Sequence, residues 1–171
     1  MRYNPIKKYL AGRKTIPTVV GIRHQMGISG ETRWLDDVIN WLDSRIKKED
    51  KVMLEIDEYP LSENFRNNIF PRTRVYFEEL CKYIERKGSV IIPGEDKERW
   101  NKYNSYHDEK VRDNEVFIPR MGEIRPRFFL VGYSHLDYLG EQMPEFSYIN
   151  LVNEGRDKGG YNLNLKMIIG K

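Results

Sequence analysis

Two apolar runs, TVVGIRHQ at residues 18–25 and FFLVGYSHL at residues 128–136, share one plan: the run ends in glycine, and histidine follows three residues later. The chain has three histidines, so two of them occupy this position. Short β-branched or aromatic apolar runs are typical of buried strands. Each run therefore predicts a strand with a histidine, His24 or His135, just beyond its carboxyl end.

Outward from these runs, strand-like and helix-like patterns alternate along the chain. Apolar residues at helical spacing over 31–48 and 73–87 predict two amphipathic helices. The predicted strands cover residues 17–22, 51–56, 89–93, 127–132 and 145–152. This alternation indicates an α/β fold, a single domain with a mainly parallel or mixed sheet of about five or six strands flanked by helices.

Four segments lack a regular apolar pattern. Residues 1–14 form a basic N-terminal arm, and 153–171 predict a turn followed by a strand or hairpin. Residues 57–72 and 96–126 are predicted as long polar loops, the second with a partial helix at its start. Because long loops in compact domains are usually functional or disordered, we expect both to be mobile and to border the site. The single domain is expected to span 1–171.

Length and composition limit the class of protein. A chain of 171 residues fits one domain with a sizeable core, and it has no apolar run long enough to span a bilayer. The only cysteine, Cys81, cannot form an internal disulfide, which favours a cytoplasmic location. A net charge of +3 spread over mixed acids and bases makes nucleic acid an unlikely partner. High charge with a single alanine resembles a thermophile composition.

Polar side chains follow four of the predicted strands. They are Arg23 and His24, Glu55 and Asp57, Glu95 and Asp96, and Ser134 and His135. In an open parallel sheet the carboxyl ends of the strands lie along one edge, where ligands bind. We therefore expect these side chains to converge on one crevice. Two imidazoles and a carboxylate are a common ligand set for Zn²⁺ or a related divalent ion, so His24, Glu55 and His135 predict a metal site.

Glu55 is the most unusual of these residues. It lies in the run VMLEID, where a carboxylate is costly unless it is paired or binds a ligand. A site role is one interpretation, and an ion pair with an arginine is the other. The candidate partners are Arg23, Arg72 and Arg74.

The other candidates have structural interpretations too. A histidine just past a strand is more often a hydrogen-bonded structural residue than a ligand. Glu95 and Asp96 also suit the first turn of a helix, where acidic side chains are favoured. His107 lies in the polar segment YNSYHDE and is expected to be solvated.

In their order, the motifs resemble a known superfamily. The segments GIRH, VMLEID, VIIPGED and FFLVGYSHLDYL, over about residues 17–140, are similar to motifs of the TraB/PrgY/GumN and Tiki superfamily, within a wider group that includes erythromycin esterases and ChaN haem-binding lipoproteins. The hallmark there is a pair of G-x-x-H motifs with an acidic strand between them. Here these motifs are Gly21–His24, Gly132–His135 and Glu55–Asp57.

The resemblance implies a metal-dependent hydrolase that cleaves an amide or ester bond. His24 and His135 would hold a divalent ion (Mn²⁺, Co²⁺ or Zn²⁺) or its water, and Glu55 would be a ligand or the general base. The substrate would be a small molecule or peptide, and its binding residues would be Arg23, Asp57, Glu95 and Ser134.

The chain departs from the family pattern in two respects. It is shorter than the usual family domain, and the arginine that closely follows the family's acidic strand is missing. The nearest candidates, Arg66, Arg72 and Arg74, lie further along. The alternative function is therefore a non-catalytic small-molecule or protein binding module that uses the same crevice. Its ligand surface would include Tyr76, Tyr103, Tyr106 and Tyr133.

Overall fold

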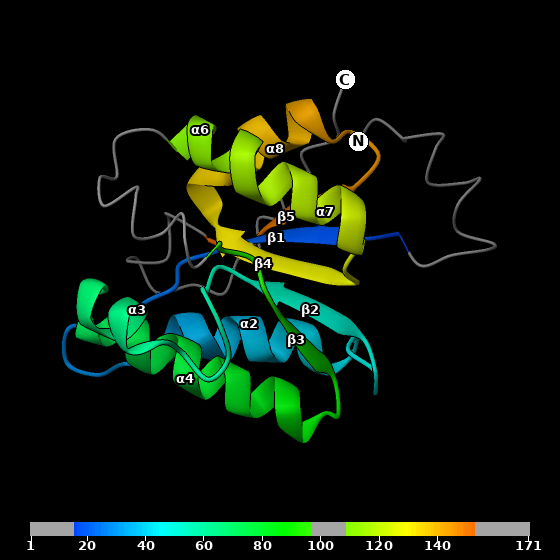
Figure 1. Ribbon diagram of the computed structural model, residues 1–171. Helices are drawn as coiled ribbons and strands as arrows, with labels where there is room; N and C mark the ends of the chain where they lie inside the picture. Colours follow the sequence, from blue (N-terminus) through cyan, green and yellow to red (C-terminus); the bar gives the residue numbers. More distant parts are fainter. Residues whose placement is uncertain (1–15, 97–108, 153–171) are drawn as a thin grey trace.

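The computed structural model describes residues 16–96 and 109–152. They form one parallel sheet with helices on both faces, which confirms the α/β class (Figure 1). The predicted N-terminal arm, the C-terminal strand or hairpin and His107 lie outside the described residues. Within the described ranges, no helix has the length and apolar character needed to cross a membrane.

The sheet places both G-x-x-H motifs side by side. Its strands are β1 (Thr18–Ile22), β2 (Lys51–Leu54), β3 (Val90–Pro93), β4 (Phe128–Gly132) and β5 (Ser147–Asn150). Their order is β3-β2-β4-β1-β5, and every neighbouring pair is parallel. In the register of β1 and β4, Ile22 is the partner of Gly132. His24 and His135 therefore leave the sheet at the same edge from adjacent strands.

The helices cover the sheet on two sides (Figure 1). On one side lie α2 (Arg33–Asp43), α3 (Glu63–Asn68) and α4 (Pro71–Arg86). On the other lie α6 (Glu109–Arg112), a π-helical segment η1 (Asp113–Phe117), α7 (Ile118–Ile124) and α8 (Leu136–Gln142), which follows a short 3₁₀ turn η2 (Tyr133–His135). The two long helices predicted from periodicity correspond to α2 and α4.

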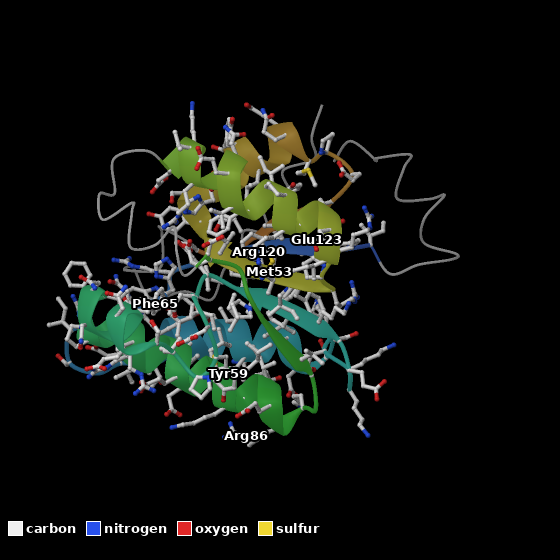
Figure 2. The ribbon with its side chains drawn as sticks, viewed as in Figure 1. Met53, Tyr59, Phe65, Arg86, Arg120 and Glu123 are labelled. Carbon is white, nitrogen blue, oxygen red and sulfur yellow. The ribbon has the colours of Figure 1, made fainter. Side chains whose placement is uncertain are left out.

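Successive strand residues point to different cores, as the pleat requires. Val20 and Leu130 pack with the α2 and α4 side, whereas Val19 and Val131 pack with the α7 and α8 side. Met53 of β2 belongs to the second core, and Figure 2 shows it close to α7. Because both faces of the sheet are covered, the strands are continuous apolar runs.

Two segments that the sequence predicted as polar loops contain helices. Within 57–72, α3 forms because the Ser62 hydroxyl accepts a hydrogen bond from the Phe65 amide at 2.9 Å and Phe65 is buried. Residues 109–124 are helical throughout, but η1 adds a residue to the turn. A π-helical segment shifts the 3.6-residue apolar period, so periodicity could not detect this helix. The loop predictions were wrong over these residues.

Candidate functional site

A cavity of about 400 Å³ opens where the strands end. Five of the predicted site residues line it: Arg23, His24, Glu55, Glu95 and Ser134. Gly132, at the end of β4, lines it as well. A crevice is therefore present at the carboxyl edge of the sheet, and it gathers residues from four strand ends. His135, Asp57 and Asp96 were expected in it as well, but they do not line it.

Glu55 lies at the centre of this site. Its Oε2 accepts a hydrogen bond from the Gly132 amide at 2.8 Å and lies 3.4 Å from His24 Nε2. Its Oε1 forms an ion pair with the guanidinium of Arg112 and lies 3.7 Å from His135 Nε2. The Gly132 amide, His24 and Arg112 thus surround one carboxylate, which also lies close to His135.

These partners keep Glu55 ionised. Burial by itself would raise the pKa of the Glu55 carboxyl, but the charge of Arg112 and the proximity of His24 outweigh it and hold the pKa well below its ordinary value of 4.5. Glu55 is therefore a fixed negative charge at neutral pH.

His24 is the imidazole that the cavity exposes. A third of its side chain, 33%, is accessible to solvent, and its ring stacks on Phe77 with centroids 5.5 Å apart. Burial lowers the pKa of His24, but the Glu55 carboxylate more than compensates, so the pKa is raised above 6.5. His24 is thus an accessible base paired with a buried carboxylate.

His135 lies beneath the cavity and is almost completely buried. Its Nδ1 is 2.7 Å from Asp113 Oδ1, and its Nε2 is 2.8 Å from Arg112 Nη2. A guanidinium can only donate, so Nε2 accepts from Arg112 and Nδ1–H donates to Asp113. That pattern belongs to the neutral ring.

Protonation of His135 competes with this contact. Burial acts to lower the pKa of His135, and the carboxylates of Asp113 and Glu55 act to raise it. A protonated ring would set an Nε2–H group against the Arg112 donor at 2.8 Å, so the two cannot coexist. The observed geometry corresponds to the neutral ring.

Glu95 is a second carboxyl beside Arg112. Its side chain is 2% exposed, and its Oε1 lies 3.3 Å from Arg112 Nη1 without a hydrogen-bond partner in the described part of the chain. Burial raises the pKa of Glu95 to about 7, against the lowering effect of Arg112. The two glutamates thus differ: Glu55 is ionised and Glu95 can hold a proton near neutral pH.

The sequence offered an ion pair of Glu55 with an arginine as one interpretation, but the partners it named, Arg23, Arg72 and Arg74, were wrong. Arg23 stacks on Trp34, with its guanidinium carbon 4.1 Å from the ring centroid. The observed partner, Arg112, was missed because its segment was predicted as a loop. The only sign of Arg112 in the sequence was a charged pair, Arg112 and Asp113, directly after the apolar residue Val111.

Asp57 and Tyr76 do not line the cavity, and both have structural roles. Asp57 Oδ1 accepts from the Glu58 amide at 2.8 Å, and its Oδ2 accepts from the Ser62 hydroxyl, so the carboxylate shapes the turn before α3. Tyr76 is completely buried in the core, which contradicts its proposed place on a ligand surface. Tyr133, by contrast, is exposed and lines the cavity.

The glycine of each G-x-x-H motif allows a close approach. A Cβ at Gly132 would lie 3.1 Å from His24 Nε2 and 3.4 Å from Glu55 Oε2. A Cβ at Gly21 would overlap the side chain of Leu136. Glycine at these positions therefore lets the strand ends pack against the site and the following helix.

The predicted metal ligands do not fit a shared ion in this arrangement. An ion bound by His24, Glu55 and His135 would have to lie where the Arg112 guanidinium contacts Glu55 Oε1 and His135 Nε2. In residues 16–96 and 109–152, no three His, Cys, Asp or Glu side chains are grouped so that they could hold a metal ion. Metal binding by these residues stays a prediction.

No family model, no curated protein and no solved structure matches the chain. The resemblance to the TraB and Tiki superfamily therefore stays a prediction from short motifs.

Proposed function

We propose that this protein is a hydrolase of ester or amide bonds, with His24 as general base and Glu55 as the carboxylate that orients it. One observation carries the proposal: an imidazole partly exposed in a cavity lies 3.4 Å from a buried, ionised carboxylate. In such a pair the carboxylate orients the ring and stabilises the imidazolium that forms when the base accepts a proton.

The reaction would proceed in two stages. In the first, His24 takes a proton from a water molecule while the water oxygen bonds to the carbonyl carbon, and the C=O electron pair moves to the carbonyl oxygen. In the second, the electron pair on the oxyanion re-forms C=O, the bond to the leaving group breaks, and His24 returns its proton to the leaving oxygen or nitrogen, which leaves a carboxylic acid. Arg112, which lines the cavity, supplies positive charge near the developing oxyanion.

The TraB/Tiki-like resemblance implies the same reaction class, but the proposal differs in the source of the positive charge at the site. In the proposal Arg112 supplies this charge, whereas the resemblance implies a divalent ion. The second function, a binding module for a small molecule or protein, would use the same cavity without turnover.

The test is hydrolysis of a panel of simple esters and amides, measured as acid release. Wild type is compared with His24→Gln, and with Glu123→Gln as a control because Glu123 is an exposed residue of α7 remote from the cavity lining. We expect His24→Gln to lower kcat/KM by about 10²-fold or more, the usual contribution of a general base, and the control to match wild type. Wild type inactive on every member, or His24→Gln as active as wild type, would refute the proposal.

A further inference from the structure

The cavity has two unlike walls. The charged residues described above form one of them, and the other is apolar. Its residues come from the end of β1 and from the α3–α4 region: Ile22, Phe65, Ile69, Phe70 and Phe77, with Thr73 of α4 as a polar residue among them. Figure 2 shows Phe65 on α3, at one end of the helical layer, and Phe65 is one of the residues that line the cavity.

The apolar wall is continuous with the proposed base. Phe77 lines the cavity and stacks on the His24 ring at an interplanar angle of 23°. Phe65 and Phe77 are 2% and 1% exposed, so the inner part of the wall is held in the core and is already formed. Because His24 is the proposed base, a bond hydrolysed with its help would lie next to this apolar surface.

The outer part of the wall is exposed. Phe70 immediately precedes α4 and is 69% exposed, although it is a large aromatic residue at the rim of a polar site. Ile69 beside it is half-buried. A rim of this kind can cover an apolar group that enters the cavity, and small-molecule sites commonly combine apolar walls with a few convergent polar groups.

We propose that the substrate carries an apolar group, an aromatic ring or an alkyl chain, next to the scissile ester or amide bond, and that the wall from Phe77 to Phe70 binds it. This inference rests on the proposed function and narrows its substrate class. The apolar group can belong to the acyl side or to the leaving side, and both share the same recognition chemistry.

The experiment compares three esters by acid release: ethyl acetate, ethyl phenylacetate and benzyl acetate. The last two carry the same ring on opposite sides of the bond. Each kcat/KM is divided by the rate constant for hydrolysis of the same ester by hydroxide, which removes differences in intrinsic reactivity. Wild type is compared with Phe70→Ala, and with Ile28→Ala as a matched control, because Ile28 is an 89% exposed apolar residue that does not line the cavity.

We expect at least one aromatic ester to exceed ethyl acetate by about tenfold or more, since each methylene-sized apolar contact in an enzyme pocket is worth about 10-fold or more in kcat/KM. Phe70→Ala should reduce this preference several-fold, and Ile28→Ala should leave it unchanged. Hydrolysis of all three esters without preference, or a preference that Phe70→Ala does not alter, would overturn the inference and leave the hydrolase proposal standing.

If wild type hydrolyses none of the esters, the hydrolase proposal fails, and binding decides the inference separately. Phenylacetamide and acetamide are titrated into wild type and Phe70→Ala by calorimetry or NMR. Binding of phenylacetamide that exceeds that of acetamide and weakens in Phe70→Ala supports the apolar wall as a recognition surface. Equal binding, or none, overturns it.

Discussion

Replacement of Glu55 by glutamine tests both the fold and the chemistry of the site. Glutamine keeps the shape and an oxygen that can accept from the Gly132 amide, but it loses the charge that faces Arg112 and His24. We expect this variant to be less stable than wild type, because Arg112 is largely buried and loses its closest carboxylate.

The magnitude follows from the partners that remain. Removing one member of a buried ion pair usually costs about 3–5 kcal/mol, because the other charge is left uncompensated. Here Arg112 keeps Glu95, at 3.3 Å, so we expect the smaller cost of a lost hydrogen bond to a charged group, about 2 kcal/mol. For a chain of this size, that corresponds to a fall in Tm of about 4–8 °C.

The assay is a thermal melt with a parallel measurement of ester hydrolysis. At pH 7, Glu55→Gln should melt below wild type and lose hydrolytic activity, and the surface control Glu123→Gln should change Tm little. The folded-state pKa of Glu55 is below its ordinary 4.5, so its contribution is complete above about pH 4.5 and is lost as the pH falls through the folded value. The difference in Tm should therefore shrink in acid.

Two results would refute this reasoning. A variant that is as stable as wild type at pH 7 would mean that the contact between Glu55 and Arg112 contributes nothing to folding. A variant that is less stable but as active as wild type would mean that Glu55 is a structural residue and does not assist His24 as a base.

Three further predictions concern the surrounding groups. The folded-state pKa of Glu95, about 7, lies above its ordinary 4.5, so wild type should lose stability on the order of 3 kcal/mol as the pH rises between these values. In thermal melts, Glu95→Gln should therefore have a higher Tm than wild type at pH 8 but not at pH 4.5. Gly132→Ala should lower kcat/KM by about tenfold or more, because the added Cβ would press on His24 and Glu55. The control Gly122→Ala has space for a Cβ and lies in α7, so it should raise the stability of the protein by about 1 kcal/mol. Because Arg112 supplies the positive charge, dialysis against a chelator should leave hydrolysis and Tm unchanged, and inactivation that Mn²⁺ or Zn²⁺ reverses would establish the metal prediction instead.

The sheet could be predicted because its strands are short, apolar and buried on both faces. β1 and β4 lie at the centre, and their continuous apolar runs TVVGI and FFLVG mark them in the sequence. The parallel arrangement then brings the residues after each strand to one edge, which is why His24, Glu55 and Glu95 were found. Each of these residues depends only on its own strand, so local pattern was sufficient.

Arg112 and Asp113 could not be found in the same way. They lie on the other helical layer, and only the tertiary fold brings them to Glu55 and His135. Their segment contains η1, whose longer turn removes the regular apolar spacing on which helix prediction depends. The apolar wall was missed for a related reason, since Phe70 and Phe77 look like ordinary helix residues until the fold brings Phe77 against the His24 ring.

The most direct test of the account is the pH dependence of kcat/KM for the best ester, measured on wild type and His24→Gln. A general base must be neutral to act, and the pKa of His24 is raised above 6.5, so wild-type activity should fall as the pH drops through a value above 6.5. His24→Gln should be about 10²-fold slower or more and should lack this limb of the profile. A His24→Gln variant that keeps the wild-type rate and the wild-type profile would contradict the assignment of His24 as the base.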